Sequence, residues 1–231
     1  MPTKANLSLA LTLALASMAA GAAGPAVLNL EAQASLEVPQ DLGRAALYAE
    51  KEAQSASEAQ SQVNKVVGEA IQQAKRRPGI TVVTTGYQTY PVYSQKAGDL
   101  KGWRVRASIQ LESKDFAQLS DTTALLSRNM NLDGITFVLS RENREKTEAT
   151  LSTDAIKAFQ DKAARAAKAF GKTQYQLKEV TVGQDGAQVM PMVGRPVMMS
   201  AKAMAFEGAA APMESGKTLV TVTVRGSVTL D

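Results

Sequence analysis

Every second residue is apolar over residues 28–38. This two-residue period predicts a half-buried strand, which the Pro-Gln-Asp segment at 39–41 would end with a turn. A weaker alternation over residues 44–52 predicts a second strand. Because only a turn separates the two, we expect them to form a hairpin.

A helix is predicted where the apolar period changes to three or four residues, between residues 59 and 74. Its start is marked by a capping box, formed either by Ser57 with Gln60 or by Ser55 with Glu58. The sequence alone leaves both caps open.

The longest helix is predicted from about residue 140 to residue 171. Its apolar residues form one stripe, with acidic residues concentrated in the first half and basic residues in the last, as the helix dipole favours. Gly171 would end this helix, because glycine enters the left-handed C-cap conformation freely. A shorter helix is predicted over residues 116–128, capped by Asp115 with Gln118 at the reciprocal position.

The remaining strands are expected at 80–89, 103–111, 135–139, 177–182 and 219–228. The first two should pair antiparallel, and Asp133-Gly134 should form a turn. The fold class is therefore α+β, with antiparallel strands packed by two long amphipathic helices and one short helix. Strand-helix-strand-strand would occur twice, over 44–113 and 135–230, as two sub-lobes, although no residue-level repeat supports a duplication.

Three tyrosines, Tyr87, Tyr90 and Tyr93, stand three residues apart between two predicted strands. They could form a face on which a ligand stacks, but we expect Pro91 to interrupt the regular element that would align them. Packing at a sheet edge is the interpretation we favour.

The first residues have the pattern of a secretory signal peptide over residues 1–23. Lys4 supplies the positive start, residues 7–19 the apolar segment, and residues 20–23 the small side chains before cleavage. A retained anchor is the alternative. Residues 24–231 would form the mature domain outside the cytoplasm, without a membrane span, since no later stretch has 18 uninterrupted apolar residues.

Histidine and cysteine are both absent. The chain therefore has no Ser-His-Asp triad, no imidazole or thiolate metal ligand, no thiol nucleophile and no disulfide. Phosphate-binding glycine loops and the Gly-x-Ser-x-Gly motif are missing as well. We expect no enzyme activity, and we assign no catalytic, cofactor-binding or metal-ligating residue and no cofactor.

The formal net charge is +4 and falls by one unit when Lys4 leaves with the leader. This charge is too small to favour a polyanionic partner, so no nucleic acid is expected. The one basic cluster, at residues 75–77, follows the first predicted helix, where it would complement the helix dipole.

The segment from residue 183 to residue 216 is unusual in composition and is expected to be a Met-rich loop. It carries Met190, Met192, Met198, Met199, Met204 and Met213. Thioethers bind Cu(I) and can be oxidised to sulfoxides, so a soft metal, a small apolar ligand or sacrificial oxidation are alternatives. The simpler interpretation is a mobile or subunit-covering apolar loop that uses the adaptability of methionine.

The order of these segments resembles the SIMPL-domain family, which includes bacterial periplasmic oxidative-stress-defence proteins and a periplasmic immunogenic protein of pathogens. The resemblance covers nearly the whole mature chain. Two departures are the Gln between Pro39 and Asp41, and Ser215, where a proline is more usual. The matching segments are 38–41, 78–80, 84–87, 90–93, 102–105, 154–171, the Met-rich tract, 211–216 and 220–228.

The resemblance implies an α+β fold, a periplasmic location and, for at least one member, a large ring-like or channel-like homo-oligomer. It carries no known active site to this sequence. We therefore expect a non-enzymatic, self-associating periplasmic protein linked to envelope or oxidative stress. The alternative is a binding module in which the Met-rich loop holds Cu(I) or a small apolar ligand.

Overall fold

A computed structural model of the protein describes residues 26–94, 98–183 and 214–230. The expected leader at 1–23 and most of the expected Met-rich loop lie outside these residues. In chain order the elements are β1 (Ala26–Pro39), β2 (Leu42–Ala53), α1 (Ala56–Lys75), β3 (Thr81–Tyr93), β4 (Leu100–Ser113), α2 (Phe116–Leu126), β5 (Asn131–Val138), α3 (Arg141–Ala169), β6 (Tyr175–Gly183) and β7 (Lys217–Leu230).

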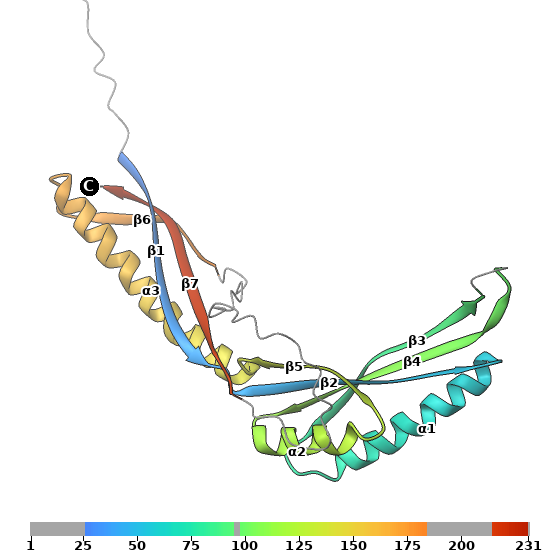
Figure 1. The fold of residues 1–231 in the computed structure, drawn as a ribbon. Coiled ribbons are helices and arrows are strands. Elements are labelled where there is room, and N and C mark those ends of the chain that lie inside the picture. Colours follow the sequence, from blue (N-terminus) through green and yellow to red (C-terminus); the bar gives the residue numbers. More distant parts are fainter. Residues whose placement is uncertain (1–25, 95–97, 184–213, 231) are drawn as a thin grey trace, which may run out of the picture.

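The strands form two antiparallel sheets, ordered β1-β7-β6 and β3-β4-β2-β5. Helix α3 covers one face of the first sheet, and α1 and α2 cover one face of the second (Figure 1). We call these the three-stranded lobe and the four-stranded lobe. The predicted α+β class, with two long helices and one short helix, is confirmed.

The four-stranded lobe is inserted in the three-stranded lobe, between β1 and α3. Each lobe contains a strand, a helix and two further strands, with sheet orders β2-β4-β3 and β1-β7-β6 for these parts. The grouping differs from the expected units, because the strand expected at 135–139 is part of β5 and pairs with β2 in the other lobe. The strand that completes the second unit is β1.

The expected hairpin of the first two strands is wrong. Strand β1 pairs with β7 over its full length, and β2 pairs with β4 and β5. The Gln40 backbone N–H donates to the Gly216 carbonyl at 2.9 Å, which extends the β1–β7 ladder beyond Pro39. The chain thus continues from one sheet into the next instead of reversing.

The core of the three-stranded lobe is formed by the inner face of the sheet and the apolar stripe of α3. Gly226 of β7 lies directly under the buried Phe159 ring, and a Cβ at this glycine would be 3.0 Å from Phe159 Cζ and 2.5 Å from the Glu179 carbonyl oxygen. The other buried apolar residues are Leu139, Leu151, Ala155, Ala163, Ala167, Val220, Val222, Val224, Val228 and Leu230.

The core of the four-stranded lobe is formed by α1 and α2 against β2 and β4. Ser55 is the N-cap of α1, and its side chain accepts from the Glu58 N–H at 3.2 Å, so the second of the two expected caps is the one present. Asp115 caps α2 by accepting from the Gln118 N–H at 3.0 Å, as expected. Gly43 allows α2 to approach, because a Cβ there would be 2.6 Å from Leu119 Cδ2.

The expected turn at Asp133-Gly134 is wrong, because both residues lie within β5. Ala46 pairs with Gly134 and Leu47 with Leu132, so Asp133 is the extra residue of a bulge. A bulge lets the strand absorb a turn-forming dipeptide without ending.

The C-terminus of α3 follows the expectation for Gly171, which has a φ of 71°. The Lys172 N–H donates to the Ala167 carbonyl at 2.9 Å and the Gly171 N–H to the Lys168 carbonyl at 3.1 Å. These are the two bonds of a Schellman C-cap. Among the described residues, no helix combines the length and apolar character that crossing a membrane requires.

Replacing Gly226 by alanine should lower the free energy of unfolding by about 1–3 kcal/mol, because the added methyl group overpacks the contact with Phe159 and Glu179. Urea denaturation followed by circular dichroism measures this change.

The matched control is Gly68→Ala in α1, where an added Cβ has no atom within 4 Å. Alanine is the better helix former there by up to about 1 kcal/mol, so this variant should be as stable as the wild type or more so. Equal effects of the two substitutions would contradict the packing described for β7.

Candidate functional site

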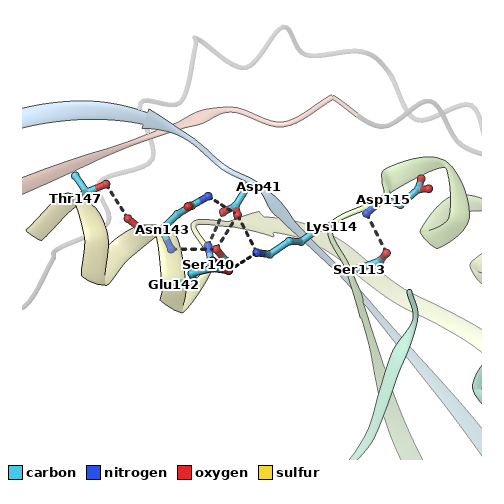
Figure 2. Close-up of polar contacts among 8 residues, drawn as sticks. All are labelled: Asp41, Ser113, Lys114, Asp115, Ser140, Glu142, Asn143 and Thr147. Carbon is cyan, nitrogen blue, oxygen red and sulfur yellow. Dashed lines mark hydrogen bonds and ion pairs between the residues drawn. The ribbon is translucent and has the colours of Figure 1, made fainter. Parts of the chain in front are cut away.

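The most connected polar site of the described residues is the junction between the lobes. The chain crosses between lobes twice, at residues 40–41 and again at residues 139–140, and both crossings meet at Asp41 (Figure 2). The Gln40 amide Nε2 donates to Thr218 Oγ1 at 3.1 Å, which ties the first crossing to β7.

Asp41 joins the two crossings by capping α3. One carboxylate oxygen accepts from the Ser140 backbone N–H at 2.6 Å. The other accepts from Ser140 Oγ at 2.6 Å and from Asn143 Nδ2 at 2.7 Å. Ser140 is itself the N-cap and accepts from the Asn143 N–H at 3.4 Å. A carboxylate at this helix end also complements the dipole of α3.

The environment of Asp41 changes its pKa in two directions. Partial burial raises the pKa of the Asp41 carboxyl. The hydrogen bonds from Ser140, a hydrogen bond from the Asp41 backbone and the positive charge of Lys114 lower this pKa, and together they outweigh burial, so the net pKa is lowered. Asp41 is therefore held as a carboxylate acceptor at neutral pH.

Lys114, which follows β4, brings the four-stranded lobe into the same cluster. Its Nζ donates to Glu142 Oε2 at 2.8 Å and lies 4.0 Å from Asp41 Oδ2. The hydrogen bond and the charge attraction between Lys114 and Glu142 raise the pKa of the lysine and lower that of the glutamate. The cluster thus contains one cation and two anions, each with a partner, and its geometry fixes how the chain passes between lobes.

A second polar site is a shallow depression of about 440 Å³ on the open face of the four-stranded sheet, opposite the helices. Its charged groups are paired. Arg104 contacts Glu52, and Arg106 lies 3.2 Å from Asp133 and stacks 3.6 Å above the Tyr48 ring. These contacts are those of a solvated sheet surface.

The three tyrosines singled out in the sequence do not form one stacking face. Tyr87 is opposite the buried Ala107, on the helix side of the sheet, whereas Tyr90 is opposite Arg104 on the open face. The expected interruption at Pro91 is wrong, because β3 continues through it. Strand β3 is a sheet edge, where a proline without an N–H is tolerated. All three tyrosine side chains are exposed at this edge.

No group of three or more acidic, His or Cys side chains that could hold a metal ion is found within the described part of the chain. The six methionines of the Met-rich tract lie outside it, so binding of Cu(I) or an apolar ligand there stays a prediction.

The Asp41–Ser140 cluster was missed by the sequence reasoning. The only signals were an Asp after the first strand and a Ser before the long helix, 99 residues apart.

The structure defines a two-lobed α+β protein in which one lobe is inserted in the other. Residues 28–228 match the SIMPL family, described as a protein of unknown function (DUF541). The chain belongs to the SIMPL family. No curated protein matches the sequence.

Two solved structures show limited similarity. One is an amidase of the hydantoinase/carbamoylase family from Burkholderia multivorans, with 13% identity, a TM-score of 0.25, and 47% of this chain and 28% of the other covered. The other is AtUAH in complex with glyoxylate, with 13% identity, a TM-score of 0.20, and 57% and 35% covered. The chain thus spans about a third of each or less, and neither similarity bears on its function.

Replacing Asp41 by alanine should lower the free energy of unfolding by about 1–3 kcal/mol at pH 7, because the donors of Ser140 and Asn143 lose a charged acceptor. The difference from the wild type should narrow in acid. The folded pKa of Asp41 is lowered, so its contribution is complete above the unfolded-state pKa and is lost as the pH falls through the folded pKa. Urea titrations at several pH values between about 3 and 7 measure both effects.

Asp154→Ala, at an exposed position of α3, is the control and should stay within about 0.5 kcal/mol of the wild type. If Asp41→Ala behaved like this control at pH 7, Asp41 would not stabilise the junction.

Proposed function

We propose that this SIMPL protein is an exported, non-enzymatic protein that self-associates in the periplasm and acts in envelope or oxidative stress. The observation that carries the proposal is the exposure of large apolar side chains at the free edge of the three-stranded sheet. Leu177, Val180 and Val182 of β6 are 55%, 41% and 46% exposed. The described residues of one chain leave this edge in water, whereas an assembly can bury it.

Export is supported by the first 23 residues, which combine Lys4, an apolar segment and small residues before residue 24. The complete lack of cysteine agrees with a chain that folds without disulfides and can be stable in either redox environment.

A role without catalysis is supported by the chemistry of the side chains. The sequence offers no His or Cys to act as base, nucleophile or soft ligand. In the described residues, the groups with shifted pKa values owe them to a helix cap or to ion pairs, as at Asp41, Lys114 and Glu142. Such contacts perturb pKa values for structural reasons.

Self-association is supported by the arrangement of the lobes. Figure 1 shows the two lobes extending away from the junction, so each sheet presents its edges separately. Within the described ranges, the four edge strands are β1 and β6 in one sheet and β3 and β5 in the other. Open edges with apolar residues favour association between chains.

Expression of the full chain in a Gram-negative host tests export. We expect the periplasmic fraction to contain a chain shortened by about 23 residues, as measured by intact mass spectrometry. A full-length chain retained in the cytoplasm or the inner membrane would contradict the periplasmic location.

Light scattering on a size-exclusion column tests self-association of the exported chain. We expect a defined mass that is a multiple of the chain mass and that decreases on dilution, as mass action requires. A mass equal to one chain at every concentration would contradict the proposal, whatever the cellular location.

A further inference from the structure

The inner face of β6 is apolar but is not covered by α3. Opposed residues of antiparallel strands share a face, so the pairs of β6 with Val224, Gly226 and Val228 place Val182, Val180 and Leu177 on the helix side. The same residues of β7 are packed under α3. Among the described residues, the helix side of the sheet is therefore covered over β7 and open over β6.

The position of α3 explains this difference. On one side the helix reaches the outer strand β1, where Lys162 Nζ donates to the Glu31 carbonyl at 2.9 Å. On the other side Tyr175, at the start of β6, donates to the Gln160 carbonyl at 3.4 Å. Ile156, one turn before Gln160, is 39% exposed on this same side. Leu177, Val180, Val182 and Ile156 form what we call the β6 strip.

The other edge strands carry features that discourage pairing with a second chain. A lysine of α3 binds a carbonyl of β1, Pro91 and two register shifts interrupt β3, and a bulge interrupts β5. Strand β6 also has a register shift, between Leu177 and Glu179, so that Lys178 is the extra residue. This bulge has a specific consequence for pairing of β6 with itself.

We propose that β6 pairs antiparallel with β6 of a second copy, about a two-fold axis between Lys178 and Glu179. This inference rests on the proposed self-association and names its surface. In this register Lys178 is opposite the partner's Glu179, Leu177 is opposite the partner's Val180, and Tyr175 is opposite the partner's Val182. The two-fold symmetry repeats each pair.

The bulge makes this register consistent on both faces. Leu177 and Val180 are three residues apart and would lie on opposite faces of a regular strand. Because Lys178 is extra, both lie on the helix side and can meet their counterparts across the axis. Gln176 and Thr181 lie together on the other face in the same way. Apolar residues therefore meet apolar residues and polar residues meet polar residues.

Neighbouring registers are disfavoured because they place like charges opposite each other and pair residues that lie on different faces of the sheet. An axis through Glu179 would place the two Glu179 side chains opposite each other and pair Leu177 with Thr181 of the other face. An axis through Lys178 would place two lysines together and pair Leu177 with Glu179. Like charges directly opposite destabilise a sheet, whereas opposite charges stabilise it. Charge complementarity thus identifies a second copy of this chain as the occupant of the edge.

The product is a continuous six-stranded sheet in the order β1-β7-β6-β6-β7-β1. Both α3 helices lie on the same face of this sheet, since the helix sides of the two β6 strands meet. The β6 strips of the two copies then adjoin between these helices, where each shields the other from water. The four-stranded lobes remain at the outer ends, with their own edges free for further contacts.

Charge reversal at the axis tests the inference on the purified exported chain. Lys178→Glu places a glutamate opposite a glutamate at both symmetry-related positions of the axis, and Glu179→Lys places a lysine opposite a lysine there. Each variant should therefore raise the dissociation constant by about tenfold or more at low salt. The double variant Lys178→Glu/Glu179→Lys should restore the wild-type mass. Light scattering gives the masses, and circular dichroism shows whether each variant is folded.

Mixing the two single variants is the sharpest measurement. In a mixed pair every position at the axis again joins an acid to a base, so the mixture should assemble more tightly than either variant does alone. Native mass spectrometry identifies the mixed pair when one of the two variants is uniformly labelled with a heavy isotope, because the two chains then differ clearly in mass. If β6 contacted any other surface of the second copy, mixing the two variants would not be expected to restore assembly.

Three results would overturn the inference. Single variants with the wild-type mass would place the interface elsewhere and leave self-association intact. Failure of the double variant or of the mixture to assemble would exclude the two-fold register. A Leu177→Asp variant that lowers the free energy of unfolding but keeps the wild-type mass would show that the strip packs within one chain. A wild-type monomer would instead refute the proposed function itself.

Discussion

The carboxylate of Asp41 holds together two chain crossings on which the whole arrangement depends. A lobe inserted between β1 and α3 requires the chain to leave and re-enter the three-stranded lobe at one place. Asp41 lies where the chain leaves the three-stranded lobe, and Ser140 lies where the chain returns to it. Three short hydrogen bonds from Ser140 and Asn143 to Asp41 hold these two crossings together. The contact also satisfies the Ser140 N–H at the start of α3, which no helical bond could reach.

The inserted topology determines which surfaces are left for partners. In the part of the chain that the structure describes, each lobe is one sheet with helices on a single face, so neither sheet closes on itself and each retains two edges. In the three-stranded lobe α3 covers β1 and β7 better than β6, because the sheet is wider than one helix. An uncovered apolar edge then follows from the architecture. In this account the proposed self-association and the fold of one chain have the same physical cause.

Sequence periodicity predicted the helices and the buried faces of the strands well. The caps at Ser55, Asp115 and Gly171 obey local rules, and the valines of the last strand alternate along a buried face as expected. Strand partners were predicted less well. Alternation shows which face of β1 is buried but not that β7, nearly 200 residues later, lies beside it. The bulge at Asp133 and the continuous strand through Pro91 likewise depend on neighbours that local patterns do not contain.

The polar junction was beyond sequence reasoning for a related reason. Asp41 and Ser140 each fit an ordinary local role, a turn residue and a helix cap. Their contact arises only because the inserted lobe returns the chain to its starting point. The charge pattern of β6 likewise did not indicate a partner strand from the sequence alone, because the bulge at Lys178 determines which residues share a face.

Amide hydrogen exchange of β6 in the assembled and diluted protein would test the central claim most directly. The account predicts that amides of β6 exchange more slowly in the assembly, because the free edge gains hydrogen-bond acceptors from a second β6, whereas the amides of β3 near Pro91 keep their rates. Unchanged exchange in β6 on assembly, with protection at another edge strand, would contradict it.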